Sequence, residues 1–420
     1  MEVKITNYKI QNKKYTIRKL QYKINTLLIF ILELTMYYNL QKLSTIQKLQ
    51  NIISTFFKYG DKNDREEQKI ISNTNFDLNN NILTKLYNLI DNIETSAFKD
   101  IQENGEITNV INYNELKKIF SFSHNLNMYN NTFYCTLEIM NKFFKNCKIT
   151  EVLELDYQEN TSKFKDSLMY FYKNNEEQIN IHNIDHIFKN KDDIFNLNKF
   201  IQVSINMYNH YHIAFINVEP VVFNNIEYEM NEVLLIYIIL SLNVIKEDGN
   251  CIIKLDLNSI SNVLYLEIFF FLSSIFKSVT LCKPKCSILN ERIFFIICKN
   301  KNIFIKDEII DVTIPVFQNI VEKPKNKFTY SFLKYDIPLF YKNKIFETFI
   351  NFQRYEVEVF DHMCNFLLSS KQNDKITNQI SKQKYRLQKW IDENSHNCRS
   401  VDFCKVNHVQ NHNETFFWDL

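Results

Sequence analysis

The spacing of apolar residues divides the chain into a helical first part and a later part in which strands and helices alternate. Apolar residues recur every three or four positions in Ile17–Leu40, Ile46–Phe57 and Asn81–Ile93, a spacing that predicts helices. Between them, Tyr59–Asn80 is rich in Asp, Asn, Lys and Glu, which is typical of a linker or an exposed loop. Residues 1–105 are therefore expected to form a helical extension that packs on the rest of the chain.

From residue 151 onwards, short apolar runs alternate with segments of helical length. The predicted strands are Glu151–Asp156, Gln178–His182, His212–Val218, Asn250–Leu255, Ser278–Cys282 and Arg292–Cys298, with helices at Glu229–Ile245 and Ser259–Phe276. This alternation is typical of βαβ units and predicts an α/β fold with a parallel sheet. Only nine residues, Lys283–Glu291, join the last two strands, which is too short for a crossover helix. These two strands are therefore expected to be antiparallel neighbours.

The pattern predicts three regions. A helical extension, 1–105, precedes an α/β domain, 106–305, and a mixed, mainly helical region, 306–420, follows it. Within the last region, Lys382–Glu393 has the apolar spacing of an amphipathic helix.

The composition of the chain excludes several kinds of nucleotide-binding loop. The chain has only 3 Gly, so it contains no Walker loop, no G-x-G-x-x-G motif and no other glycine-rich phosphate cradle. One of the three, Gly249, follows the predicted helix Glu229–Ile245, where a left-handed residue would let the chain reverse. The 36 Phe and 23 Tyr, with many Asn, Ile and Lys, indicate AT-rich codons, so aromatic abundance does not identify base-stacking surfaces.

Charge and cysteine content bear on partners and compartment. The net charge of +2 excludes a global polycation for nucleic acid or membranes. The nine cysteines are scattered and odd in number, which favours a reducing compartment over a disulfide framework. The apolar runs Leu27–Leu34, Val233–Ile245 and Ile268–Phe276 are shorter than the roughly 18–20 residues that span a bilayer, and no secretory signal is visible. A soluble, cytoplasmic protein is expected.

Several segments resemble one enzyme family. They are IKEDGNCIIK at 245–254, KPKCS at 283–287 followed by FIIC at 295–298, NTFYCTLEIMN at 131–141, DDI at 192–194, and the helix 382–394. Together they resemble the FtsJ-like ribose 2′-O-methyltransferases, most of all the cap methyltransferase-like proteins of large cytoplasmic DNA viruses. The resemblance implies a Rossmann-like sheet with an antiparallel last hairpin, S-adenosylmethionine as cofactor, capped mRNA as the RNA partner, and a viral protein in the host cytoplasm or the virion.

The family removes the ribose proton with a Lys-Asp-Lys-Glu tetrad, and the resemblance assigns its members here residue by residue. Lys254 matches the second lysine without a gap, and a lysine amine can accept the proton once its neighbours tune it. The outward-facing end of a strand is the structural alternative for this lysine. Asn217 occupies the aspartate position and keeps the shape but not the charge; Glu219 is the candidate substitute.

The other two members of the tetrad do not match directly. The first lysine position falls on Cys135. The glutamate position falls on Ile293 by direct counting, and on Glu291 if the loop is two residues shorter than in the family. The catalytic candidates are therefore Lys254, Asn217 and Glu291.

The cofactor loop also departs from the family. The resemblance assigns cofactor contacts to Asp156, Asp193 and Asn217, but Glu154–Asn160 lacks the glycines that let the ligand approach the backbone. Tyr157 and Gln158 are expected to fill part of that space. The resemblance thus implies a degenerate methyltransferase with weak or no activity. Two alternatives remain: an active cap methyltransferase using Lys254 with Glu291 and Glu219, or a non-catalytic scaffold that binds RNA or a protein partner.

Two groups of potential ligands lie outside these motifs. Cys398, Cys404, His408 and His412 have a compact Cys2His2 arrangement, but the first pair is more widely spaced than zinc sites prefer, so a polar tail with free thiols is favoured and no metal is predicted. His182, His186, His210 and His212 cluster around predicted strand ends. They are interpreted as solvated loop histidines, with an RNA groove as the alternative for His210 and His212.

Overall fold

The protein is described by a computed structural model. The structure describes residues 37–40, 53–58, 131–157, 164–172, 179–218, 221–223, 226–228, 230–256, 263–287, 293–302, 306–322, 330–333, 337–352 and 373–394.

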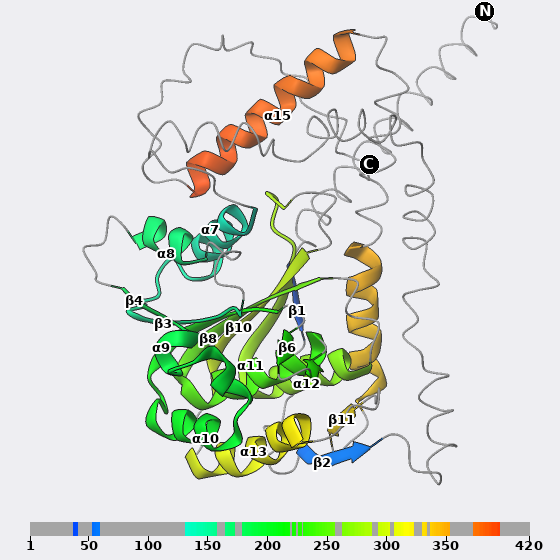
Figure 1. Ribbon diagram of the computed structural model, residues 1–420. Coiled ribbons are helices and arrows are strands. Elements are labelled where there is room, and N and C mark those ends of the chain that lie inside the picture. The colour runs from blue at the N-terminus through cyan, green and yellow to red at the C-terminus, as the bar shows by residue number, and fades with distance from the viewer. Residues whose placement is uncertain are drawn as a thin grey trace, which may run out of the picture.

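A mixed seven-stranded sheet forms the centre of the fold, with strand order β1-β9-β10-β8-β5-β3-β4 (Figure 1). Its strands are β1 (Tyr37–Leu40), β3 (Glu151–Leu155), β4 (Asn180–Asn183), β5 (Tyr211–Asn217), β8 (Ile245–Asp256), β9 (Phe276–Cys282) and β10 (Ile293–Lys301). β4, β3, β5 and β8 are parallel neighbours, whereas β10 is antiparallel to both β8 and β9. The predicted antiparallel pairing of the last two strands is confirmed, and so is the α/β class.

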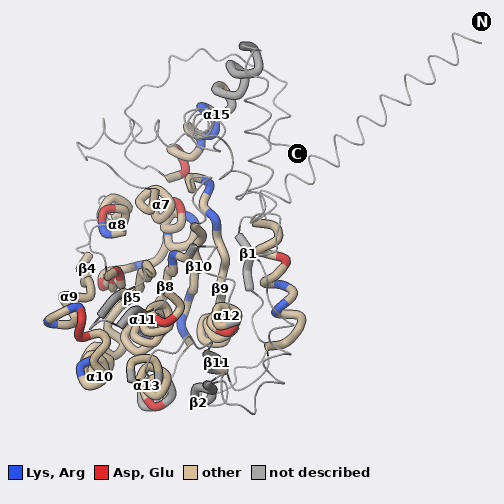
Figure 2. The backbone as a smooth tube through the Cα atoms, turned by 45° about the vertical axis from the view of Figure 1, so that its right-hand side comes forward, with Lys and Arg blue, Asp and Glu red and all other residues tan. Residues whose placement is uncertain are grey.

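Helices cover both faces of this sheet (Figures 1 and 2). On one face lie α7 (Asn131–Phe143), α8 (Phe164–Tyr172) and α15 (Asn373–Asn394). On the other lie α10 (Leu197–Asn206), α11 (Met230–Val244), α12 (Val263–Ile275) and α13 (Lys306–Glu322). The short helices α9 (Ile184–Ile187) and η2 (Lys191–Phe195) connect β4 to α10. The predicted amphipathic helix Lys382–Glu393 lies within α15, and its Leu387, Trp390 and Ile391 are buried.

Alternate residues of the central strands enter two separate apolar cores, as the two-residue period of a strand requires. In β8, Ile252 packs beneath α7 and α8, whereas Ile253 packs against the α10–α13 layer. α11 is apolar nearly all round and almost completely buried, which is expected of a helix held between a sheet and further helices. The helices beyond residue 305 thus contribute to the same two cores as the sheet.

Two predicted helices in the first hundred residues are partly wrong. Tyr37–Leu40, at the end of the predicted helix Ile17–Leu40, is strand β1 and pairs with β9. Ile53–Lys58, which overlaps the predicted helix Ile46–Phe57, is strand β2 and pairs with β11 (Tyr330–Leu333). Both strands pair with segments more than 200 residues away, so tertiary hydrogen bonding overrides the local helical spacing. The remainder of these segments, the linker Tyr59–Asn80 and Asn81–Ile93 lie outside the described residues.

The reason for Gly249 also differs from the expected one. The left-handed residue in this turn is Asp248, with φ 57°, and its carboxylate accepts a hydrogen bond from Lys277 Nζ at 2.5 Å. At Gly249 a Cβ would lie 2.8 Å from the carbonyl oxygen of Lys246 and closer still to Ile245 Cγ2. Glycine is therefore needed here because the backbone approaches too closely for a side chain, and not because of its φ angle.

A further pair of short strands, β6 (Val221–Phe223) and β7 (Ile226–Tyr228), forms a hairpin before α11. Within the described part of the chain, no helix is long and apolar enough to cross a membrane.

Candidate functional site

Three polar residues form a row across the carboxyl ends of three neighbouring parallel strands. Asp156 follows β3, Asn217 ends β5, and Lys254 lies near the end of β8. Asn217 is the direct partner of Lys254 in the β5–β8 pairing. Its side-chain Nδ2 donates a hydrogen bond to Asp156 Oδ2 at 3.1 Å, and both side chains are buried. The structure therefore brings together the three site residues predicted at the ends of these strands.

The row projects toward the face of the sheet that α7, α8 and α15 cover. Asn217 has the same two-residue phase as Ile213 and Phe215, and Lys254 has the same phase as Ile252; these three apolar residues belong to the core beneath α7 and α8. Lys254 is half-buried and lies opposite Phe295 of β10. Lys254 therefore lies on the helix-covered face of the sheet and not on a face exposed to solvent. Its catalytic role stays a prediction.

The loop after β3 is closed by a short hydrogen bond. Tyr157 Oη donates to Asp192 Oδ1 at 2.5 Å, and the Tyr157 ring makes an edge contact with Phe195 and lies 4.6 Å from Lys191 Nζ. Desolvation, followed by the hydrogen bond to the Asp192 carboxylate, raises the pKa of Tyr157 to about 12. The tyrosine therefore keeps its proton at neutral pH and links the end of β3 to η2.

The acidic segment 192–194 is placed beside the β3 loop, but its two carboxylates have different partners. Asp193, the predicted cofactor contact, forms an ion pair with Lys199 of α10 at 2.6 Å. Asp192, which the sequence did not single out, is the residue that contacts Tyr157. The role of Asp193 as a cofactor contact stays a prediction, and the direction of a side chain within a 3₁₀ helix has no signature in a single sequence.

On α7, a thiol stands where the resemblance expects the first lysine of the tetrad. Cys135 is buried, and its Sγ lies 3.7 Å from Sγ of Cys286, in the loop after β9. One turn later, the buried carboxylate of Glu138 accepts hydrogen bonds from the backbone amides of Lys285 (3.0 Å) and Cys286 (3.3 Å) and from Trp390 Nε1 (2.9 Å). Glu138 joins three segments far apart in sequence, and sequence analysis missed it because an acid in a helix is usually solvated.

A second polar cluster lies on the opposite face, toward the amino ends of β3 and β5. The Nε2 atoms of His182 and His210 lie 3.9 and 3.7 Å from the same carboxylate oxygen of Glu151. His182 Nδ1 lies 3.1 Å from Tyr211 Oη. Desolvation lowers the pKa of His182, partly offset by Glu151. Of the histidines predicted to be solvated, His182 and His210 are therefore partly buried beside one acid, whereas His186 is exposed as predicted.

His212 belongs to the same end of the sheet but has different partners. Its Nδ1 accepts a hydrogen bond from the backbone amide of Glu151 at 3.2 Å, and its Nε2 lies 3.1 Å from Lys246 Nζ. Desolvation and then the Lys246 charge lower the pKa of His212. The neutral imidazole is the form that suits this position.

Several predicted residues lie outside the part of the chain that the structure describes. They are Glu291, Glu219, Gln158 and the Cys398, Cys404, His408 and His412 group. Ile293, the alternative to Glu291, is described and begins β10 opposite Asp256. Among the described residues, no group of three or more His, Cys, Asp or Glu side chains could hold a metal ion.

Comparison of the chain with known protein families and with curated proteins finds no significant match.

Proposed function

We propose that this chain is a degenerate homologue of the viral FtsJ-like ribose 2′-O-methyltransferases, with capped mRNA as its RNA partner and weak or no methyl transfer. The observation that carries the proposal is the row Asp156–Asn217–Lys254 at the carboxyl ends of β3, β5 and β8. In open α/β sheets, this end of the parallel strands is where ligands bind. The parallel strands followed by the antiparallel β9–β10 pair also agree with the Rossmann-like sheet that the resemblance implies.

Asn217 is the reason for proposing weak or no activity. A lysine can accept a ribose proton only in its neutral form, and a neighbouring charge helps to orient and tune it. Asn217 has no charge, and its amide group already donates to Asp156. Cys135 on α7 offers a buried thiol in place of a second amine. When several catalytic residues act together, removing one of them removes most of the rate enhancement, so Lys254 alone would support little catalysis.

The residues at the β3 loop do not suit S-adenosylmethionine in the position that the resemblance implies. Tyr157 adds a large side chain where the family has glycine. Its hydroxyl donates a hydrogen bond to the Asp192 carboxylate, which then has one acceptor position fewer for a ligand. The Asp193 carboxylate forms an ion pair with Lys199. A small molecule gains affinity by burying most of its surface in a preformed cleft, so these contacts favour weak or undetectable cofactor binding.

Calorimetric titration with S-adenosylmethionine, together with transfer of a radiolabelled methyl group to capped RNA, tests the proposal. We expect no cofactor binding in the micromolar range and no transfer above background. Micromolar binding would contradict the expected loss of the cofactor site, and transfer abolished by Lys254→Ala but retained by the exposed-lysine control Lys277→Ala would show an active enzyme.

That result would support the second candidate, an active cap methyltransferase that uses Lys254 with Glu291 and Glu219. Its specific support is that Lys254 is half-buried near the carboxyl end of β8, on the helix-covered face of the sheet. Binding of capped RNA without cofactor binding would instead favour the non-catalytic scaffold.

The free thiols of the six described cysteines support a reducing compartment such as the host cytoplasm.

A further inference from the structure

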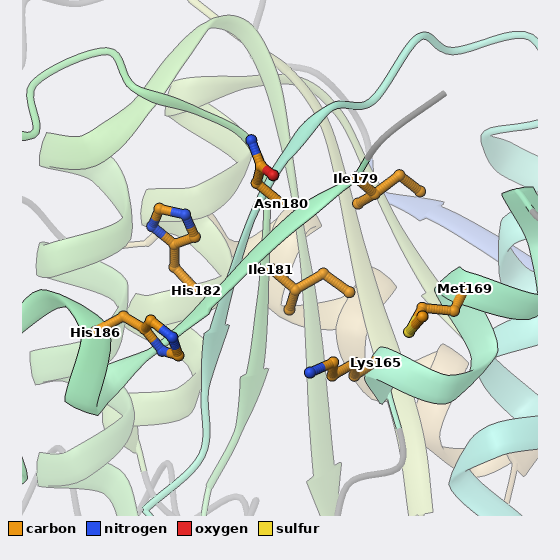
Figure 3. Close-up of a pocket in the computed structure, with 7 residues that line it drawn as sticks. All are labelled: Lys165, Met169, Ile179, Asn180, Ile181, His182 and His186. Atoms are coloured by element: carbon orange, nitrogen blue, oxygen red, sulfur yellow. The ribbon is translucent and has the colours of Figure 1, made fainter. Parts of the chain in front are cut away.

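Two buried thiols from segments far apart in sequence lie in contact between α7 and the turn after β9. Cys135 is in the first half of α7, and Cys286 is in the turn, 151 residues later. Their sulfurs lie 3.7 Å apart, and both thiols are free. Four strands separate β9 from β4, beside which lies a cavity lined in part by Met169 and His186 (Figure 3). The thiol pair is therefore distinct from that cavity.

The hydrogen bonds of the two thiols direct one sulfur at the other. Cys286 Sγ donates to Cys135 Sγ, and Cys135 Sγ donates in turn to Asn131 Oδ1 at 3.5 Å. Because Cys135 accepts the hydrogen bond, one of its lone pairs points at the Cys286 sulfur. A thiol that attacks an oxidised sulfur uses such a lone pair to form the new S–S bond. The pair is thus oriented for the second step of disulfide formation.

Glu138 holds the turn at this distance from α7. One of its carboxylate oxygens accepts from the amide of Lys285, and the other accepts from the amide of Cys286 and from Trp390 Nε1. Both oxygens are engaged as hydrogen-bond acceptors, so the carboxylate and the thiols are not arranged as a metal centre. Two groups that are already held in contact have lost most of the freedom that their reaction would otherwise cost.

A disulfide between these residues needs only a local movement. The S–S bond is about 2.05 Å long, so the two sulfurs must approach by roughly 1.7 Å from their separation of 3.7 Å. Rotation about the χ1 bonds moves both sulfurs. Cys286 also lies in a turn, and a turn shifts more readily than a packed helix such as α7.

We infer that Cys135 and Cys286 are a site of reversible disulfide formation, driven by a hydroperoxide, that links α7 covalently to the turn after β9. Cys286 is 4% exposed and Cys135 is 1% exposed, so the peroxide reaches Cys286 first. With hydrogen peroxide, the Cys286 thiolate attacks one oxygen, the O–O bond breaks, and a sulfenic acid and one water form. Cys135 then attacks the sulfenic sulfur and releases a second water. The two thiols lose two electrons and two protons in all, and these reduce one peroxide to two waters.

Burial makes this reaction slow. Desolvation raises the pKa of Cys286, and the contact with Cys135 and the nearby Glu138 carboxylate raise it further. Most of the thiol is therefore protonated at neutral pH, and the thiolate is the form that reacts. The pair is expected to stay reduced in a reducing compartment and to form the disulfide on sustained exposure to peroxide.

Peptide mapping of the full chain tests the inference. The chain is incubated with hydrogen peroxide at about pH 8.5, near the ordinary thiol pKa, and its remaining thiols are alkylated after denaturation. We expect a Cys135–Cys286 crosslink that dithiothreitol reverses. The thermal midpoint should rise by roughly 3–6 °C, because a crosslink across 151 residues restricts the unfolded chain.

Three variants separate this pair from the other thiols. Cys135→Ser and Cys286→Ser should each lose both the crosslink and the rise in midpoint. Cys147→Ser, at a half-buried thiol just beyond α7, is the matched control and should keep both. Each variant is compared with its own reduced form, so a loss of stability caused by the substitution does not affect the comparison.

Four results would overturn the inference. Peroxide could leave both thiols free, or it could join either of them to another cysteine such as Cys282, which faces the same core. It could oxidise Cys286 irreversibly to the sulfinic acid. A crosslink that lowers the thermal midpoint would show that the folded chain does not accommodate the disulfide.

Discussion

At the scale of single residues, Asn217 illustrates how a buried side-chain amide is held by a neighbouring carboxylate. Its Nδ2 donates to Asp156 Oδ2 at 3.1 Å in a buried setting, between a carboxylate and the strand that carries Lys254. An aspartate at position 217 would have no donor for Asp156. The asparagine is therefore part of a hydrogen-bonded pair, and an aspartate at this position would break that pair.

We predict that Asn217→Asp lowers stability at pH 7 by about 1–3 kcal/mol, because two buried carboxylates would share one site. One of them would then have a raised pKa in the folded state. The penalty is therefore greatest at neutral pH and shrinks as pH falls and that carboxyl becomes protonated. Thermal unfolding between pH 4 and pH 8 measures this. The exposed control Asn206→Asp should follow the wild type; equal stability of Asn217→Asp and wild type at pH 7 would contradict the prediction.

At the scale of elements, the buried carboxylate of Glu138 holds α7, the loop after β9 and α15 together. It accepts three hydrogen bonds, two from backbone amides and one from the Trp390 indole. The Trp390 and Tyr134 rings also meet edge to face, with centroids 6.2 Å apart. The position of the C-terminal helix on the sheet therefore depends on one polar centre within an apolar core.

We predict that Glu138→Gln destabilises the protein by roughly 2 kcal/mol, because a neutral amide has one acceptor oxygen and a buried donor is left unpaired. Urea unfolding measures the loss, and hydrogen exchange of the α15 amides locates it. Trp390→Phe should remove part of the same energy, so the double variant should lose less than the sum of the two. The control Glu393→Gln changes an exposed acid on α15 and should have little effect. Strict additivity would show that Glu138 does not act through Trp390.

At the scale of the whole molecule, the two ends of the sheet carry different polar chemistry. The carboxyl end holds the Asp156–Asn217–Lys254 row, and the amino end holds histidines around Glu151 and Lys246. Burial lowers the pKa of both His182 and His212. Since unfolding exposes these groups to water, their protonation couples to the stability of the whole fold.

The sign of this coupling follows from the two lowered pKa values. The unfolded chain binds more protons than the folded one once pH falls below about 6.5, the ordinary histidine value, so stability decreases there. We predict that His212→Gln reduces this acid destabilisation, because glutamine can accept the Glu151 amide hydrogen bond without gaining charge beside Lys246. Urea midpoints at pH 5 and pH 7.5 measure the effect. His186→Gln, an exposed histidine on α9, is the matched control. If the urea midpoint of His212→Gln fell between pH 7.5 and pH 5 by as much as that of the wild type, the protonation of His212 would not be the cause of the acid destabilisation.

Much of the α/β region could be predicted because its signals are local. The strands predicted from residue 151 onwards are short apolar runs, the predicted helices Glu229–Ile245 and Ser259–Phe276 are longer ones, and the nine-residue connection Lys283–Glu291 excludes a parallel crossover. The ungapped segment 245–254 places Lys254 near a strand end, and the parallel sheet then brings it beside Asn217. The strands, the helices and the position of Lys254 depend on residues close together in sequence, so the sequence by itself determines them; the pairing of Lys254 with Asn217 needs the sheet.

Other features were decided only by the tertiary structure. Strands β1 and β2 exist because β9 and β11 offer them backbone partners, and Asp192 rather than Asp193 meets Tyr157 because of how η2 lies against the β3 loop. The buried role of Glu138 and the position of β4 at the end of the described sheet depend on which segments lie next to them. The physical reason is common to all four. Backbone pairing and the burial of a charge are set by groups distant in sequence, and their energies exceed the weak local preferences that a sequence pattern records.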